Sequence, residues 1–361
     1  MLKQTGINMK KQFLILSISL TLMLACNIGA ATPLPQSSGL LATLSASTPL
    51  GGTPFYFNNE TPTPTSEFNL ATVAPTLVVP TSSSINPPTG HIVFTCQIYK
   101  VQASNQICIM NADGSGWRRL TTDSNRQHYY PSLSPDGQSV VYAAFREENI
   151  YEIYEMNLAS GDVKQLTNKI GVVNGPEISP DGESIVFKLW TVYSDRNVIM
   201  TIDRNGEDLG NIPHAEGWDP TWSPDGKYVL FASDMDGSIQ LYTIRADGKQ
   251  LKKISNLPAI RGRSDWSPDG QYIVTYSGEA WHREVYIMNA DGTNARVLSP
   301  AGGNSQGPSF SPDGKWVAFT AYFDHPGDDH GCEIYIVRVD GTDLRRLTNN
   351  DYCDYQPRWG P

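Results

Sequence analysis

The chain has 361 residues and a formal net charge of −10 at pH 7. This length is ample for a domain with a well-buried core. The acidic balance, with no basic stripe along the sequence, argues against nucleic acid as a partner.

The first 26 residues have the pattern of an export signal. Met9-Lys10-Lys11 precedes an apolar run from Phe13 to Ala25, which is too short to span a bilayer but fits the core of a signal peptide. Met9 is a credible start, with Met1 as the alternative. The run ends in Met-Leu-Ala-Cys at Cys26, which resembles a bacterial lipoprotein box. This resemblance implies an exported protein whose lipidated Cys26 anchors it to a membrane, at the cell surface or in the periplasm; an ordinary cleaved signal is the alternative.

Residues 27–88 are dominated by Thr, Pro, Ser and Ala. Such a composition cannot bury a core, so we expect a disordered, partly polyproline II tether. A flexible chain of about 60 residues spans roughly 45 Å, which would let a folded domain stand off the membrane.

The remaining segment, residues 89–361, is built from one repeated unit. Ser-Pro-Asp-Gly starts at residues 134, 179, 223, 267 and 311, at intervals of 45, 44, 44 and 44. Short runs rich in β-branched and aromatic residues, bounded by Asp-Gly turns, separate the copies and predict strands. Each unit therefore reads as a four-stranded antiparallel blade of a propeller. The tetrapeptide itself predicts a structural turn, because Pro presets φ, Asp accepts backbone hydrogen bonds and Gly takes positive φ.

The two ends of the repeat region predict the number of blades. His91–Cys96 resembles the second strand of a blade, but no first strand precedes it. Tyr355–Pro361 matches the segment Trp218–Pro224, which contains a first strand, and the chain then stops. We expect the C-terminal strand to complete the N-terminal blade. The fold class is therefore all-β, a six-bladed β-propeller closed by its C-terminal strand, which leaves no open sheet edge at the seam.

Four cysteines lie in this segment, and an exported protein permits disulfides. No Cys-x-x-Cys spacing is present, so zinc is a poor fit. We prefer the pairs Cys96–Cys108 and Cys332–Cys353, and the pairing Cys96–Cys353 stays open as an alternative.

The repeats differ most in the segments that lead into the innermost strands. In a propeller these segments gather around the mouth of the central channel. Their aromatic, amide and charged side chains predict a ligand-binding face, with ordinary loop and core residues as the alternative. Its candidate residues are Tyr130, Trp218, Asp219, Arg263, Gln306, Tyr355 and Gln356.

Catalytic or metal-binding residues are harder to find. One loop carries the metal-ligand candidates Asp324, His325, Asp328, Asp329 and His330, and His282 lies in a comparable loop of the neighbouring blade. Such side chains bind Ca²⁺ or transition metals, but their spacing matches no metal motif, so we expect no cofactor. Gly303–Gly307 matches Gly-x-Ser-x-Gly, yet it falls between two strands, where a nucleophile elbow does not occur, so we assign no catalytic residue.

The Ser-Pro-Asp-Gly copies, with their Val-Val-Tyr-type and Leu-Thr columns, resemble the propeller repeats of the TolB C-terminal domain over residues 90–361. The resemblance implies a six-bladed propeller. TolB is a periplasmic protein that binds a peptidoglycan-associated lipoprotein, but here a lipoprotein box and tether stand in place of its α/β domain. We therefore expect a non-enzymatic module that binds a protein or glycan of the cell envelope. The alternative is a metal-dependent, lyase-like enzyme acting on carbohydrate at the channel mouth.

Overall fold

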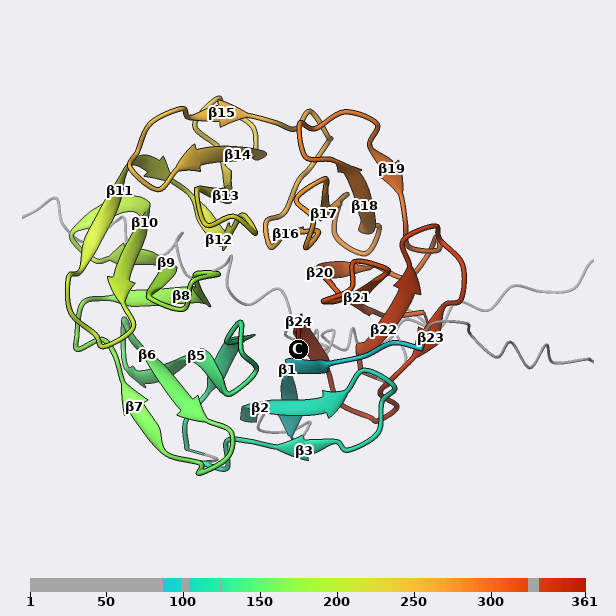
Figure 1. The fold of residues 1–361 in the computed structure, drawn as a ribbon, viewed down its shortest axis with the longest axis horizontal. Coiled ribbons are helices and arrows are strands. Elements are labelled where there is room, and N and C mark those ends of the chain that lie inside the picture. The colour runs from blue at the N-terminus through green and yellow to red at the C-terminus, as the bar shows by residue number, and fades with distance from the viewer. Residues whose placement is uncertain (1–86, 99–103, 124, 324–330) are drawn as a thin grey trace, which may run out of the picture. The chain divides into compact units, whose positions relative to one another are not determined.

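The computed structural model describes residues 87–98, 104–123, 125–323 and 331–361. The predictions for the signal peptide, for Cys26 and for the tether before residue 87 lie outside these ranges. The described residues form six four-stranded antiparallel sheets around a central axis, as Figure 1 shows, so the prediction of a six-bladed propeller is confirmed. Within those ranges there is no helix that is long and apolar enough to cross a membrane.

The blades are numbered from the seam, so that blade 1 contains β1. The innermost strands of blades 1 to 6 are β24 (Asp354–Gly360), β4 (His128–Leu133), β8 (Val172–Ile178), β12 (Trp218–Trp222), β16 (Asp265–Trp266) and β20 (Gln306–Phe310). The second strands are β1 (His91–Ile98), β5 (Ser139–Glu147), β9 (Ser184–Thr191), β13 (Tyr228–Ser233), β17 (Tyr272–Ser277) and β21 (Trp316–Ala321).

The outer half of each blade completes the meander. The third strands are β2 (Ser104–Asn111), β6 (Ile150–Asn157), β10 (Ser194–Asp203), β14 (Gln240–Arg245), β18 (Glu284–Asn289) and β22 (Glu333–Arg338). The outermost strands are β3 (Arg118–Arg119), β7 (Val163–Gln165), β11 (Gly210–Glu216), β15 (Lys252–Lys253), β19 (Arg296–Val297) and β23 (Arg345–Arg346). Most of these edge strands are short and basic, which disfavours pairing of their open edges with another chain.

Blade 1 joins the two ends of the propeller sequence. Strand β24 pairs with β1 antiparallel, with Gly360 opposite His91 and Asp354 opposite Cys96 (Figure 1). The backbone N–H of Gln97 also donates to the carbonyl of Cys353 at 2.9 Å. The predicted closure by the C-terminal strand is therefore confirmed.

Two disulfides flank this seam. Cys96–Cys108 links β1 to β2 inside blade 1, and Cys332–Cys353 links the segment before β22 in blade 6 to the residue before β24. These are the pairs that we preferred, and the alternative pair Cys96–Cys353 does not form. The second bridge holds the start of the closing strand against the preceding blade.

The five Ser-Pro-Asp-Gly segments share one hydrogen-bond pattern. In each, the Ser hydroxyl donates to the Asp carboxylate at 2.5–2.7 Å and accepts the backbone N–H five residues later. The same carboxylate accepts the N–H two residues beyond it. All groups of the motif are thus engaged in the turn, which supports its structural interpretation.

The Leu-Thr column also has a local cause. Its hydroxyl residues are Thr121, Thr167, Ser255, Ser299 and Thr348. In five blades the hydroxyl of its Thr or Ser accepts a backbone N–H of the third strand at 2.8–3.0 Å. This bond attaches the outermost strand to the blade where the ladder itself is only two or three residues long.

The core consists of six apolar clusters, and each lies between two neighbouring blades. One cluster, for example, packs Ile92 and Phe94 of blade 1 against Trp316 and Ile334 of blade 6. The others repeat this arrangement around the ring. Because every blade needs a neighbour on both sides to bury its faces, the seam is as important to the core as any other interface.

A buried carboxyl at the seam makes stability depend on pH. Asp354 is 2% exposed and accepts the Asn350 side-chain N–H at 2.8 Å. Burial, with the nearby Glu333 carboxyl, raises the pKa of Asp354 to about 7. An unfolded Asp has a pKa of about 3.9, so the folded state binds this proton more tightly, and the resulting stability is lost as pH rises through about 7.

We therefore expect Asp354→Asn to be more stable than the wild type above pH 7, with the gap narrowing as the pH falls. Denaturant unfolding between about pH 4 and pH 8, which covers the unfolded and folded pKa values, measures the effect. The substitution Asp162→Asn, at an exposed position, serves as the control. A pH-independent difference between Asp354→Asn and the wild type would contradict the assignment.

Candidate functional site

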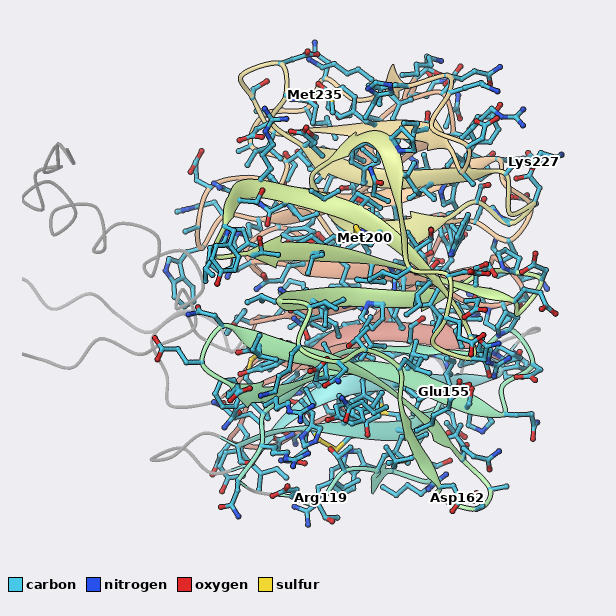
Figure 2. All side chains as sticks on the ribbon, turned by 90° about the vertical axis from the view of Figure 1, so that its left-hand side faces the viewer. Arg119, Glu155, Asp162, Met200, Lys227 and Met235 are labelled. Carbon is cyan, nitrogen blue, oxygen red and sulfur yellow. A yellow bond between two sulfur atoms is a disulfide. The ribbon has the colours of Figure 1, made fainter. Side chains whose placement is uncertain are left out.

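The strand order gives the propeller two distinct faces. In blade 3, Val172 at the start of β8 pairs with Trp190 near the end of β9. We call the face formed by the starts of the innermost strands and the loops between second and third strands the mouth face. The opposite face, called the turn face, carries the Ser-Pro-Asp-Gly turns and the Asp-Gly hairpins. Lys227 and Asp162 lie at its edge in the side view of Figure 2.

Five innermost strands contain the same bulge directly before their proline. The residue there has a φ of 52° to 61°, and the strand register shifts around it. The bulge residues are Tyr130, Gly175, Asp219, Gly307 and Gln356. Such a bulge re-aims neighbouring side chains, here toward the channel. Blade 5 differs, because Ser264 stands where the other blades have proline.

The bulges change where the candidate residues lie. We expected these side chains in loops that lead into the strands. The structure instead places most of them inside the innermost strands, because the strands continue through the bulge. These residues are Tyr130, Trp218, Asp219, Gln306, Tyr355 and Gln356, whereas Arg263 precedes β16. The six strand residues are half-buried around the channel, and Arg263 is buried.

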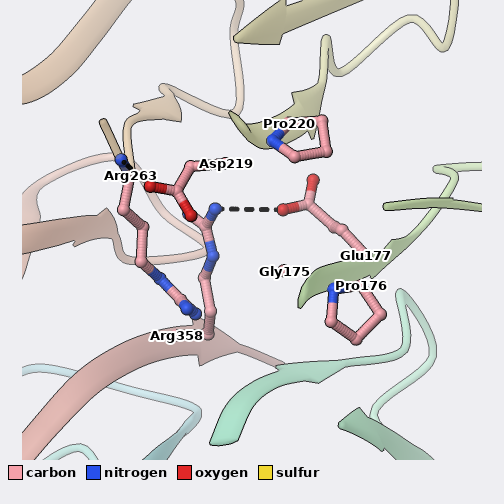
Figure 3. A pocket seen from close by; sticks show the side chains of 7 residues that line it. All are labelled: Gly175, Pro176, Glu177, Asp219, Pro220, Arg263 and Arg358. Carbon is pink, nitrogen blue, oxygen red and sulfur yellow. Dashed lines mark hydrogen bonds and ion pairs between the residues drawn. The ribbon is translucent and has the colours of Figure 1, made fainter. Parts of the chain in front are cut away.

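A small cavity lies on the axis at this level. It measures about 10 Å³, which is room for one water molecule. Its lining, drawn in Figure 3, consists of Gly175, Pro176, Glu177, Asp219, Pro220, Arg263 and Arg358. Four of these seven residues are charged, so the channel is filled by ionic side chains rather than by apolar ones.

Arg358, from the closing strand β24, is the centre of this network. Its guanidinium contacts the carboxylate of Glu177 at 3.2 Å and that of Asp265 at 3.3 Å, and the first contact is the dashed line in Figure 3. It also donates to the Ser264 carbonyl at 3.2 Å. Burial lowers the pKa of Arg358, but the carboxylates of Asp265 and Glu177 outweigh it, and the pKa lies above its usual value.

The two carboxylates extend the network to further blades. Glu177 accepts the hydroxyl of Thr221 and the N–H of Trp222, both on blade 4. Asp265 accepts the hydroxyl of Ser309 and the N–H of Phe310, both on blade 6. One arginine on blade 1 is thus connected to blades 3, 4, 5 and 6.

Arg263 crosses the axis just beside Arg358. It is 6% exposed, donates to the Pro131 carbonyl of blade 2 at 3.1 Å, and lies 5.6 Å from the ring centre of Tyr130. Its backbone N–H donates to the Asp219 carboxylate at 3.0 Å. Burial lowers the pKa of Arg263 to about 10, which still leaves it charged at neutral pH.

The charges in and around this channel balance. Two guanidinium groups face three carboxylates, and Lys188 lies close enough to Asp219 for the two charged groups to interact. The carboxylates belong to Glu177, Asp219 and Asp265. Compensated buried charges fix geometry more than they add stability, because desolvation offsets the Coulomb attraction.

The remaining candidates make specific contacts at the mouth. The side-chain amide oxygen of Gln356 accepts the Tyr130 backbone N–H at 2.9 Å, and that of Gln306 accepts an N–H of the Arg283 guanidinium at 2.9 Å. The Tyr355 hydroxyl donates to Asn105 at 2.8 Å. Trp218 packs at the edge of an apolar cluster.

Sequence reasoning missed Glu177, Asp265 and Arg358, although a signal was present. All three occupy the position after the proline column, where the other blades carry Ser132, Thr221 and Ser309. Charged residues stand in blades 1, 3 and 5, and hydroxyl residues stand in blades 2, 4 and 6. This alternation marks the three charged positions in the sequence, whereas the contacts between them depend on the size of the ring.

Four exposed apolar side chains lie on the loops of the mouth face, and others, such as Trp117 and Leu344, lie near the turn face. Tyr193 is 96%, Trp281 56%, Val192 55% and Met235 40% exposed, and they come from three consecutive blades. Trp281 has a φ of 67°, uncommon for a bulky residue, and its indole meets Tyr322 edge-on at 5.6 Å.

The structure does not test the predicted metal ligands as a group. Asp324, His325, Asp328, Asp329 and His330 lie outside the described residues. His282 is exposed. Over the described ranges, no three His, Cys, Asp or Glu side chains form a metal-binding group.

Comparison with known proteins agrees with this geometry. The family model described as TolB beta propeller domain matches residues 88–361. The chain belongs to the TolB beta-propeller family. An uncharacterized protein of Agrobacterium fabrum is 31% identical over 173 residues, covering 44% of this chain and 56% of that protein. The Tol-Pal system protein TolB of Francisella tularensis is 25% identical over 145 residues, covering 40% of this chain and 33% of that protein.

A solved structure shows the same fold. TolB from Acinetobacter baumannii superposes with a TM-score of 0.67 at 23% identity, covering 76% of this chain and 68% of that one. This chain thus spans only about a third to a half of the two sequence relatives named above. This likeness shows that the chain has the TolB-type propeller fold. It does not extend to the partners of those proteins.

Removing Arg358 should be severe. We expect Arg358→Met to lower the unfolding free energy by about 3–5 kcal/mol, because Glu177 and Asp265 would stay buried without a counter-charge. Denaturant unfolding measures the change. Arg196→Ala, which breaks an ion pair whose side chains are 71% and 46% exposed, is the matched control and should change it by less than about 1 kcal/mol. Equal effects of the two variants would show that the channel network is not a buried charge cluster.

Proposed function

We propose that this protein is an exported, lipid-anchored binding module that recognises another protein of the cell envelope through its mouth face. Membership of the TolB beta-propeller family supports a non-enzymatic envelope module at this coarse level. One named relative is a Tol-Pal system protein, which fits an extracytoplasmic location. The lipid anchor at Cys26, the partner and the binding surface are the parts that need experiment.

The exposed apolar loops of the mouth face carry the proposal. Tyr193, Met235 and Trp281 expose large side chains on three neighbouring blades, at the positions where the repeats diverge. Exposed apolar and aromatic side chains on a rigid scaffold mark protein interaction sites. Aromatic residues of this kind often supply most of the binding energy.

The channel favours a surface partner over a small molecule. Arg263 and Arg358 occupy the axis, and the cavity beside them holds about one water molecule. Drug-sized ligands need pockets of several hundred Å³. A partner therefore contacts the rim and the loops of the mouth face rather than entering the channel deeply.

The path of the chain is compatible with anchoring. Strand β1 begins at His91, which pairs with Gly360 at the end of the innermost strand β24. The polypeptide thus leads into the propeller at the turn face. An anchor at Cys26 would therefore connect to the propeller through the strand that forms the seam.

The binding test uses the full chain as bait in an envelope extract, with Trp281→Ala and Tyr193→Ala as mouth-face variants. Each should weaken capture of the protein partner at least about tenfold, the size of a typical hot-spot loss. Trp117→Ala and Leu344→Ala, whose parent side chains are 52% and 41% exposed near the turn face, are the matched controls. Loss of capture in the controls alone, or recovery of a glycan in place of a protein, would overturn the proposal.

The anchor is tested separately. Cys26→Ser should move the protein from the membrane fraction to the soluble exported fraction, because acyl chains supply the membrane affinity. Fractionation with metabolic labelling by a fatty acid measures this. An unlabelled wild-type protein would contradict lipidation while leaving the mouth-face assignment intact.

A further inference from the structure

Blade 3 brings a lysine and an asparagine together beneath the mouth face. Lys188 on β9 lies directly opposite Asn174 on β8 in the strand register. Both side chains are nearly buried, with exposures of 5% and 7%. By contrast, the lysines that form surface ion pairs have side chains 36–78% exposed.

The two functional groups are in contact. With its amide oriented so that the NH₂ group donates to the Val173 carbonyl at 2.7 Å, Asn174 presents its amide oxygen 3.3 Å from Nζ of Lys188. This orientation satisfies both groups, whereas the opposite one sets donor against donor. The amine is thus held against the carbonyl of a carboxamide inside the protein.

A carboxylate completes the arrangement. Asp219, on the neighbouring strand β12, is close enough to Lys188 to act on its charge. One Asp219 oxygen also lies 3.7 Å from the Cβ position of Gly175, the residue that follows Asn174. Burial lowers the pKa of Lys188 to about 8. About a tenth of the amine would therefore be neutral at pH 7 and able to act as a nucleophile.

We propose that Lys188 and Asn174 react with each other to form an intramolecular isopeptide bond. Nζ of Lys188 attacks Cγ of Asn174, a new C–N bond forms, and the bond from Cγ to Nδ2 breaks. The proton that Nζ loses passes to Nδ2, which leaves as ammonia. No atom changes oxidation state, and no further reactant is needed.

The bond would link β8 to β9 covalently in a part of the ring that the two disulfides do not reach. Those bridges lie in and next to blade 1. Because Asn174 directly precedes the bulge at Gly175, the link would also fix the segment that presents Glu177 to Arg358. This inference concerns the scaffold and does not depend on the proposed partner.

The test is peptide mass spectrometry of the purified full chain. Cleavage after glutamate cuts at Glu177 and Glu183 and so separates the peptide with Asn174 from the peptide with Lys188. Neither peptide contains cysteine. We expect a linked pair whose mass is the sum of both peptides less one ammonia molecule, persisting after reduction. Two separate peptides of ordinary mass would overturn the proposal.

Variants assign the roles. Lys188→Arg and Asn174→Ala should each abolish the linked pair, whereas Lys169→Arg, at an exposed lysine between blades 2 and 3, should leave it unchanged. A linked pair that survives Lys188→Arg would identify a different cross-link and overturn the assignment.

Discussion

The pairing of β24 with β1 is the constraint on which the rest of this structure depends. A propeller blade is a twisted sheet with two apolar faces, and each face is buried only against the next blade. The cluster that contains Phe94 and Trp316 exists because the C-terminal strand completes blade 1 and brings it against blade 6. Closure therefore supplies one of six equivalent cores and, at the same time, removes the open edges of the first and last sheets. The disulfide Cys332–Cys353 acts on this interface, since it ties the start of the closing strand to blade 6.

The same seven-residue strand also supplies the centre of the channel. Arg358 is part of β24, and its contacts with Glu177 and Asp265 reach two blades that lie far from it in sequence. The ionic network can therefore assemble only when the ring has closed. A lone guanidinium or carboxylate at this depth would be strongly unfavourable, so the network penalises incomplete closure more than it rewards the closed state.

Most of the fold could be predicted because its causes are local and repeated. The Ser-Pro-Asp-Gly turn and the Leu-Thr hydroxyl each satisfy backbone groups within one blade, so the sequence period exposes them directly. The site was less predictable for two reasons. The bulge before each proline turns expected loop residues such as Tyr130 and Asp219 into strand residues, and a bulge has no strong sequence signature. The contacts of Arg358 span the axis, so they depend on the size of the ring rather than on any neighbouring residue.

The two faces of the propeller differ in how far their residues repeat from blade to blade. On the turn face, the Ser and Asp side chains of each Ser-Pro-Asp-Gly motif bind one another in the same pattern. The loops of the mouth face are released from that pattern, and they carry Tyr193, Met235 and Trp281. In a repeat protein, the residues that the units share form the contacts that close the ring. A partner can be recognised only through residues that differ between the units.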